Sequence, residues 1–339
     1  MRSYLRSIGF FAITLTMAVA ITGLSASGAK ADDVHTLRIA TLAPRGSAWD
    51  KAFRAWKNTL EKETNGKLVL EFYPGGAQGD ERDYIRKMKA GQLDGAAVTT
   101  TGLGQVVRPV LVLQLPGVFR SYEAIDKVRD SLDEEFRGEF DKAGFALMGW
   151  GDVGRARLFS NASITTPTDF KTAHPWAWRD DVIFSEFLKV VGANSQRLGV
   201  NEVLPALQTG RVDAFPSSAL AAVSLQWYNH AKFVTKQSDS ILIGATILRK
   251  DVVDGLPKDL RDKLFETSAR AHKILAKSIR DADDKAYQAI LKRGVKEVDI
   301  SGHEKEWEAA AKTVRQNLAG RLYPKELLDR VEKVAASAK

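Results

Sequence analysis

Hydrophobic and polar positions switch between strand-like and helix-like spacing from residue 35 onward. The stretches "HTLRIATLAP" and "KLVLEFYP" predict strands, and Trp49, Phe53, Trp56 and Leu60 recur between them at helical spacing. Further strands are predicted at "LDGAAVTTT" and "FALMGWG", with helical segments before each. This alternation predicts an α/β fold with mainly parallel strand pairing.

The same alternation starts again after residue 165. "HPWAW", "SQRL" and "RVDAF" predict three more strands, separated by helical segments that end at Gly192 and Gly210. From Asp251 onward the pattern becomes helical, with one long helix from Leu256-Pro257 to about Lys292. A chain of this length can form two lobes, and we expect crossing strands to join them.

The pattern divides the chain into four parts. We predict a signal peptide at 1–31, a first lobe at 32–152 with 244–300 returning to it, a second lobe at 153–243, and C-terminal helices at 301–339.

The N-terminus has the pattern of a secretory signal peptide. Arg2 and Arg6 precede an apolar stretch, and Ala29-Lys30-Ala31 is a small-x-small cleavage site. We therefore expect export to the periplasm with cleavage after Ala31. A membrane anchor is the weaker alternative, because the apolar run is short for a membrane span of about 20 residues. We expect no direct membrane insertion of the mature protein.

Charge and composition narrow the functional classes. The net charge of +8 falls to +5 without the leader, and the basic residues are scattered, which argues against nucleic-acid binding. The chain has no cysteine, and its five histidines lack metal-ligand spacing, so we expect no metal. Gly-x-Ser-x-Gly is absent, and the glycines of "TGLGQV" and "PGGAQGD" complete no nucleotide fingerprint. These observations favour a binding protein without cofactor over an enzyme.

Candidate ligand contacts lie at the expected strand ends and helix starts, where α/β folds bind small molecules. Together they combine aromatic rings, hydroxyl groups and one or two cations, which suits an apolar or aromatic solute with a few polar groups. The candidates are Thr99, Thr100, Phe119, Trp150, Arg157, Trp176, Trp178, Phe215 and Ser217.

Trp176 and Trp178 alternate along one predicted strand, so both side chains should point to the same face. That face is either the core or the wall of a ligand site. For Trp176 the ligand wall is the preferred interpretation, whereas core packing is an equal alternative for Trp178. For Arg157 the alternative is a salt bridge at the rim of the site, and for Phe119 it is the core.

Several stretches, in order along nearly the whole mature chain, resemble the solute-binding subunits of tripartite ATP-independent periplasmic (TRAP) transporters. They include "LRIATLAPRGSAWDKAF", "FYPGGAQGDERDYIRKMKAGQLDGAAV", "TTPTDFK" and "VGANSQRLGVNEVLPALQTGRVDAF". The resemblance implies two α/β lobes around a cleft, braced by long C-terminal helices. It also implies cleft closure on a solute, commonly an organic acid, and delivery to a small and a large membrane subunit.

One departure from the family pattern concerns the solute. The family usually has an Arg that clamps the solute carboxylate on the strand after this "TPTDFK" element, where this chain has Trp176, and its usual Gly is Thr172. An indole has a large apolar face and no charge. We therefore expect an apolar or aromatic solute, including monocarboxylates, with Arg157 as an alternative cation.

Three alternatives remain open at this point. The first is an ordinary binder of C4-dicarboxylate-like organic acids that uses a displaced Arg. The second is a secreted α/β hydrolase, for which Ser217 or Ser218 with His230 is the available pair. The third is a ligand-sensing partner of a membrane receptor.

Overall fold

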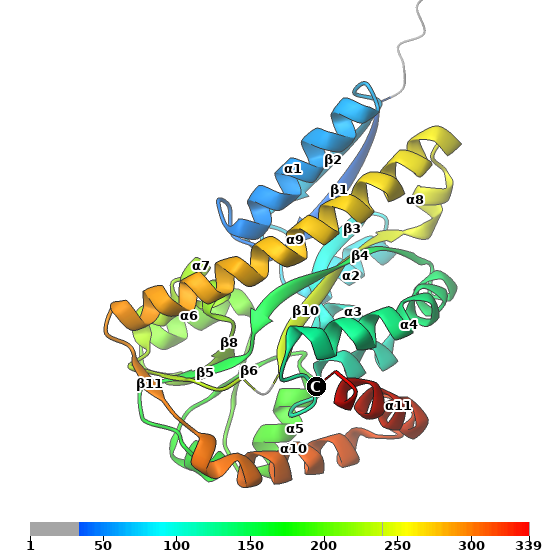
Figure 1. The fold of residues 1–339 in the computed structure, drawn as a ribbon. Helices are drawn as coiled ribbons and strands as arrows, with labels where there is room; N and C mark the ends of the chain where they lie inside the picture. The colour runs from blue at the N-terminus through cyan, green and yellow to red at the C-terminus, as the bar shows by residue number, and fades with distance from the viewer. Residues whose placement is uncertain (1–33, 239, 339) are drawn as a thin grey trace, which may run out of the picture. The chain divides into compact units, whose positions relative to one another are not determined.

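A five-stranded mixed sheet holds the first strands of the chain (Figure 1). The computed structural model describes residues 34–238 and 240–338. The predicted signal peptide lies outside the described residues. In the order β2-β1-β3-β10-β4, the strands are β2 (Leu68–Tyr73), β1 (His35–Thr41), β3 (Gly95–Thr99), β10 (Ile241–Arg249) and β4 (Phe145–Arg155).

A second, four-stranded sheet and a short strand pair form the other half of the fold. The four-stranded order is β11 (Lys296–Val298), β9 (Phe233–Thr235), β5 (Arg157–Ser160) and β8 (Ala214–Ser217). Strands β6 (Trp176–Trp178) and β7 (Gln196–Leu198) pair in parallel beside it, and Pro175 bridges to Ala214 of β8. The two sheets with their helices confirm the two-lobed α/β fold.

The expectation of mainly parallel pairing is wrong. Strand β10 is antiparallel to both β3 and β4, and β5 is antiparallel to both β8 and β9. The reason is the route of the chain, which leaves the first sheet along β4 into β5 and returns from β9 into β10. A returning strand beside an outgoing strand must run in the opposite direction. The residue boundaries of the two lobes stay a prediction. Strand β11 falls within the range 244–300 that is predicted to belong to the first lobe, but it pairs with β9 in the four-stranded sheet.

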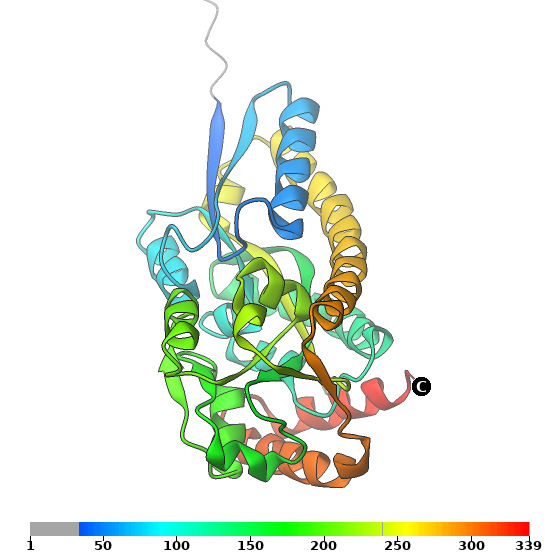
Figure 2. The same cartoon turned by 90° about the vertical axis from the view of Figure 1, so that its left-hand side faces the viewer.

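Helices cover both sheets. The long helix α9 (Lys258–Lys292) confirms the predicted long C-terminal helix and packs against α1 (Ala48–Glu63), β4 and α7 (Ala219–Ser224) (Figures 1 and 2). Near the C-terminus, α10 (Glu304–Leu318) packs on α5 (Val182–Val190) and α11 (Lys325–Ala336) packs on α4 (Tyr122–Lys142). The remaining helices are α2 (Glu81–Lys89), α3 (Thr100–Leu103), α6 (Val200–Gln208) and α8 (Lys250–Asp254), with 3-10 helices η1 (Arg108–Gln114), η2 (Pro167–Thr172), η3 (Trp227–His230) and η4 (Ser301–His303).

Two buried acids fix the place where β4 passes from one sheet to the other. Asp152 of β4 is paired with Arg129 of α4 at 2.7 Å and with Arg280 of α9. Asp283 of α9 accepts hydrogen bonds from the backbone N–H of Arg155 at 2.9 Å and of Leu220 at 2.9 Å. Both carboxylates are almost completely buried. Because buried carboxylates need partners, these contacts hold α9 against the crossing strand and against α7.

A buried histidine joins α9 to the first sheet. The Nδ1–H of His272 donates to the Ser268 carbonyl at 2.8 Å, and Nε2 accepts from the Thr246 hydroxyl at 2.9 Å. The ring lies edge-on to Trp56 with centroids 5.2 Å apart. Burial lowers the pKa of His272 to about 4, because the charged imidazolium would lose its hydration.

The lowered pKa of His272 predicts acid sensitivity. Between pH 6.5 and pH 4 the unfolded chain binds this proton and the folded chain does not, so stability falls as the pH falls through this window. In His272→Gln, the loss of unfolding free energy between pH 7 and pH 4.5 should be smaller by ~2.5 kcal/mol than in the wild type. Urea unfolding at the two pH values measures it. His303→Gln, at a partly exposed position, is the control, and equal losses in wild type and His272→Gln would contradict the assignment.

Candidate functional site

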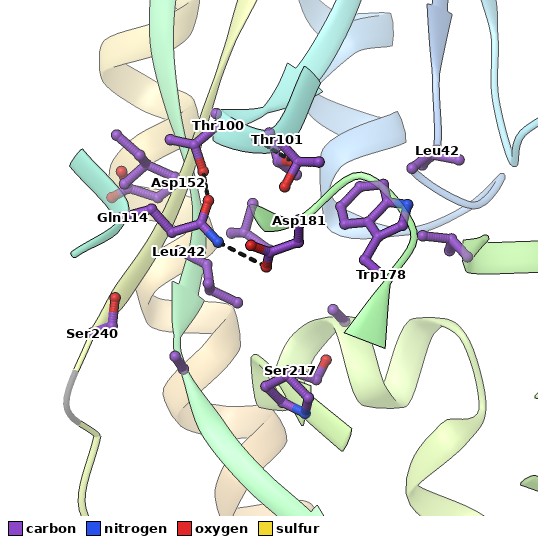
Figure 3. Close-up of a pocket in the computed structure, with 18 of the residues that line it drawn as sticks. Leu42, Thr100, Thr101, Gln114, Asp152, Trp178, Asp181, Ser217, Ser240 and Leu242 are labelled. Atoms are coloured by element: carbon purple, nitrogen blue, oxygen red, sulfur yellow. Dashed lines mark hydrogen bonds between the residues drawn. The ribbon is translucent and has the colours of Figure 1, made fainter. Parts of the chain in front are cut away.

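A cavity of about 330 Å³ lies among the ends of β1 and β3 from the first sheet and β5, β6 and β8 from the other half. Most of its lining is apolar, including Leu42, Phe53, Leu158 and Leu242. The polar lining consists mainly of hydroxyl, amide and carboxyl groups, some of which Figure 3 labels. Its position at strand ends, between two sheets, is typical of small-molecule sites in α/β proteins.

A cluster of tryptophans forms part of the cavity wall. Trp176, Trp178 and Trp227 line it, with Trp176 and Trp178 stacked at 6.2 Å and Trp176 edge-on to Trp227 at 5.1 Å. The shared face of Trp176 and Trp178 agrees with their alternation along β6. The Nε1–H of Trp176 donates to the carbonyl of Leu198 in the paired strand β7 at 3.0 Å. Trp176 is 5 % exposed, so it offers the cavity a small part of its aromatic surface and no free donor.

Trp178 is held by a residue from the first half of the chain. Its Nε1–H donates to the carboxylate of Asp80, which lies 3.1 Å and 3.2 Å away through its two oxygens. Asp80 is the residue that caps α2. This contact orients the Trp178 ring at the cavity, where Figure 3 shows it near Leu42.

A chain of hydrogen bonds links α3 to the start of α5. The Thr100 hydroxyl donates to the Gln114 amide oxygen, and Gln114 Nε2 donates to Asp181 at 3.0 Å (Figure 3). Asp181 also accepts from the N–H groups of Ile183 and Phe184 as the N-cap of α5. Burial raises the pKa of Asp181. Sequence reasoning proposed Thr100 but missed Asp181, although an Asp before an apolar helical run is an N-cap signal.

A second buried carboxyl group lies behind Thr99. Glu81, in the first turn of α2, accepts from Thr99 N at 2.8 Å, from the Thr99 hydroxyl at 2.9 Å and from Gly102 N at 2.8 Å. Burial raises the pKa of Glu81 to about 8 against the opposite effect of these hydrogen bonds. The Thr99 hydroxyl also accepts from Thr101 N, so this predicted site residue orders the turn into α3 as well as lining the cavity.

Arg157 is the only cationic side chain that lines the cavity among residues 34–238 and 240–338. It is 9 % exposed, its guanidinium lies 3.7 Å from the Tyr287 ring centroid, and it donates to the carbonyl groups of Thr235 and Lys236. Its Nε has no hydrogen-bond partner within the described part of the chain. Burial lowers the pKa of Arg157, although an arginine keeps its charge.

Three predicted ligand residues do not line the cavity. Phe119 is fully buried in the core beneath the first sheet, and Phe215 is fully buried with its ring stacked 5.2 Å from Phe159. Trp150 packs edge-on to Phe136 of α4, and its Nε1–H donates to Asp133 at 2.7 Å. Sequence position placed these residues near strand ends, but their side chains meet core residues or α4 instead of the cavity.

The hydroxyl groups near the end of β8 are engaged with backbone groups. Ser217 lines the cavity and donates to the Ser218 carbonyl at 3.0 Å, and Ser218 accepts from Ala221 N at 3.1 Å as the cap of α7. Neither hydroxyl contacts His230 within the described residues. The pair nominated for a hydrolase is therefore not assembled, because a nucleophile needs its base within hydrogen-bond reach.

The described residues contain no cluster of three or more His, Asp or Glu side chains able to bind a metal ion. Among the helices of the same residues, none combines the length and apolar character needed to cross a bilayer.

Comparison with known proteins gives the context of this site. A family model described as "Bacterial extracellular solute-binding protein, family 7" matches residues 39–321. The C4-dicarboxylate-binding periplasmic protein DctP of Rhodobacter capsulatus is 25% identical over 288 residues, which are 84% of this chain and 85% of that protein. A solute-binding protein of Albidiferax ferrireducens is 26% identical over 79% of this chain and 80% of its own length.

Solved structures share the fold. A sugar-acid-binding protein of Advenella mimigardefordensis in complex with galactonate aligns with a TM-score of 0.85 and 18% identity, over 91% of this chain and 99% of that chain. An extracytoplasmic solute receptor of Bordetella pertussis that binds pyroglutamic acid aligns with a TM-score of 0.82 and 16% identity, over 88% and 100%. These relatives are binding proteins, which confirms the expectation of binding rather than catalysis.

The bridging role of Gln114 can be tested by removing its amide. Gln114→Met keeps a side chain of similar length but leaves Asp181 and the buried Thr100 hydroxyl without this partner. The unfolding free energy should fall by about 1–3 kcal/mol, because buried polar groups lose a hydrogen bond. Urea unfolding measures the change, with Gln92→Met at an exposed position as the control. Equal loss in both variants would contradict a bridging role.

Proposed function

Because the chain belongs to the bacterial extracellular solute-binding protein family 7, the solute receptors of TRAP transporters, we propose that it captures a small organic acid with an apolar or aromatic body and a single carboxylate. The solute binds in the cavity beside Trp176, and the two lobes close around it. A cavity of about 330 Å³ is at the small end of the range for ligand sites, which suits a compact solute.

The main support for this proposal is the environment of the Trp176 side chain. Its indole faces the cavity while its N–H is already bonded to Leu198, so it contributes apolar surface and no free donor. An aromatic face attracts apolar groups and ring edges, and it cannot replace a two-pronged guanidinium clamp. Trp227, Leu242 and Leu158 extend the same apolar surface.

The charges around the cavity favour a monoanion over a dianion. Arg157 is the cationic side chain that lines the cavity in the described residues, and it supplies positive charge there, while its unpartnered Nε atom is itself buried. The nearby carboxyl groups of Glu81 and Asp181 have no salt-bridge partner among the described residues, whereas Asp152 is paired with Arg129 and Arg280. A second negative charge on the solute would be repelled wherever these groups are ionised.

The relatives support an organic acid as the solute class. The Rhodobacter relative is named for C4-dicarboxylates, and the two structural neighbours hold galactonate and pyroglutamic acid, all of which carry a carboxylate. A C4-dicarboxylate-like solute held by a displaced Arg is the second candidate, favoured by the name of the Rhodobacter relative and by the position of Arg157 in the cavity lining. Delivery to a small and a large membrane subunit, and a periplasmic location after cleavage at Ala31, complete the proposal.

Two measurements test the proposed solute class. Mass spectrometry of small molecules released from the purified protein identifies what it carries. Thermal denaturation with benzoate, phenylacetate, galacturonate and succinate ranks the classes directly, because a bound solute raises the melting temperature. We expect benzoate or phenylacetate to stabilise the protein most. Strongest stabilisation by succinate would favour the dicarboxylate alternative instead.

A matched pair of variants tests the role of Trp176. Trp176→Leu should weaken binding of the best panel member at least tenfold, about 1.4 kcal/mol, since it removes an aromatic face from the cavity wall. Phe215→Leu truncates an aromatic ring in the same cluster that does not line the cavity. It should lower stability and leave affinity within twofold, as titration calorimetry can establish. A similar loss of affinity in both variants would remove Trp176 from the site.

A further inference from the structure

Asp80 joins the two halves of the fold through one carboxylate. It caps α2, which packs against β3 of the five-stranded sheet, and accepts from Glu81 N at 2.7 Å. The same carboxylate accepts from Trp178 Nε1 at 3.1 Å and from Val200 N, at the start of α6, at 3.0 Å. Strand β6, which carries Trp178, adjoins β8 of the four-stranded sheet. One group thus receives donors from both sides of the cavity.

The surfaces around Asp80 are shaped for this close approach. A Cβ atom on Gly199 would lie 2.7 Å from Asp80 Oδ2, and one on Gly76 would lie 2.5 Å from Asn201 Nδ2. Real Cβ atoms do not approach other atoms so closely, so any larger residue at either position would force the facing side chain to move. Arg82 and Asp180 add an ion pair at 3.4 Å along the same edge. We call the residues Gly76, Asp80, Arg82, Trp178, Asp180, Gly199, Val200 and Asn201 the seam.

We propose that Asp80 is a positioning residue that latches the closed cleft and holds the Trp178 ring in the cavity wall. The inference rests on the lobe closure in the proposed function. When the seam opens, Asp80 keeps its own helix cap but loses Trp178 and Val200, and Trp178 loses the partner that fixes its indole. Closure therefore fixes the orientation of Trp178 in the cavity wall. A solute that packs against this wall in turn favours the closed state.

The Asp80 carboxylate is suited to this role because it accepts hydrogen bonds from N–H groups at the starts of two helices. Val200 N is an N–H group at a helix start that has no partner within its own helix, and Asp80 also faces the start of α2. A negative charge is favoured at helix N-termini, and hydrogen bonds to a charged acceptor are stronger than neutral ones. In the open state these N–H groups hydrogen-bond to water instead of to Asp80. The latch is stabilised by the difference in free energy between the hydrogen bonds to Asp80 in the closed state and those to water in the open state.

Two variants weaken the latch by different routes. Asp80→Asn keeps a side chain that caps α2 well but removes the charge and one acceptor oxygen. Gly199→Ala replaces no polar group, and its backbone is compatible with alanine because its φ is −73°. The added Cβ would lie 2.7 Å from Asp80 Oδ2 when the seam is closed, and the milder contact with Glu202 Oε2 at 3.1 Å lies within its own helix. The controls are Asp169→Asn, whose hydrogen bonds are to its own turn, and Gly138→Ala, where a Cβ meets nothing within 4 Å.

The seam can be measured without knowing the solute. The chain has no cysteine, so Lys89→Cys and Gln208→Cys, at exposed ends of α2 and α6, accept spin labels selectively. Pulsed electron paramagnetic resonance on the full protein as isolated should give one main distance in the labelled parent and in both controls. Asp80→Asn and Gly199→Ala should each shift at least half of the population to longer distances. Unchanged distances in these two variants would overturn the latch.

A second readout separates positioning of Trp178 from general stability. Protein containing 5-fluorotryptophan gives a fluorine resonance for Trp178, assigned by its loss in Trp178→Phe. This resonance should move in Asp80→Asn and Gly199→Ala and stay unchanged in Asp169→Asn and Gly138→Ala. A resonance that stays in place while the seam opens would overturn the link to the cavity wall. If no panel acid binds, the solute class fails, whereas the distances and the resonance still decide the latch.

Discussion

The passage of β4 into β5 alongside α9 is the constraint on which the rest of the structure depends. Here the chain leaves one sheet for another, and α9 lies across the crossing with Arg280 paired to Asp152 and Asp283 bonded to Arg155 N. A Cβ atom on Gly154, whose φ is +128°, would lie only 2.5 Å from the Asp283 carboxylate carbon, so that side chain lies directly on the strand. This arrangement sets both sheets around one cavity.

The polar groups of the cavity are mostly satisfied inside the protein. The Trp176 and Trp178 N–H groups bond to Leu198 and Asp80, and Asp181 takes its donors from its own helix and from Gln114. Groups already satisfied in this way contribute little net attraction for a solute, because a new hydrogen bond would replace an existing one. The rest of the lining is mostly aromatic and aliphatic surface, with Arg157 as its cationic side chain among the described residues. This distribution supports the proposed recognition by shape and apolar contact.

Local patterns predicted the elements well, and they predicted side-chain faces, but not what each face meets. The period of two placed Trp176 and Trp178 on one face, and the helical pattern placed α9 almost to the residue. The same reasoning proposed Trp150, which instead packs on α4 with its N–H bonded to Asp133. It could not find the Gln114–Asp181 bridge, because those residues are 67 positions apart and meet only through the fold. The antiparallel β10 likewise follows from the route of the whole chain.

The cavity wall combines parts that neither half of the fold supplies alone. Aromatic rings come from α1 in one half and from β6, α5 and η3 in the other, and the Thr99–Thr101 hydroxyl groups come from the end of β3 and the start of α3. Trp178 belongs to one half but has its indole fixed by Asp80 from the other. A solute bound to one open half would therefore meet an incomplete surface with water on its remaining side. Apolar burial grows with the area removed from water, so only the closed arrangement gives an apolar solute most of its binding free energy. In the proposed mode of binding, an aromatic wall makes recognition depend more strongly on closure than a guanidinium clamp would, since a guanidinium can hold a carboxylate from a single side.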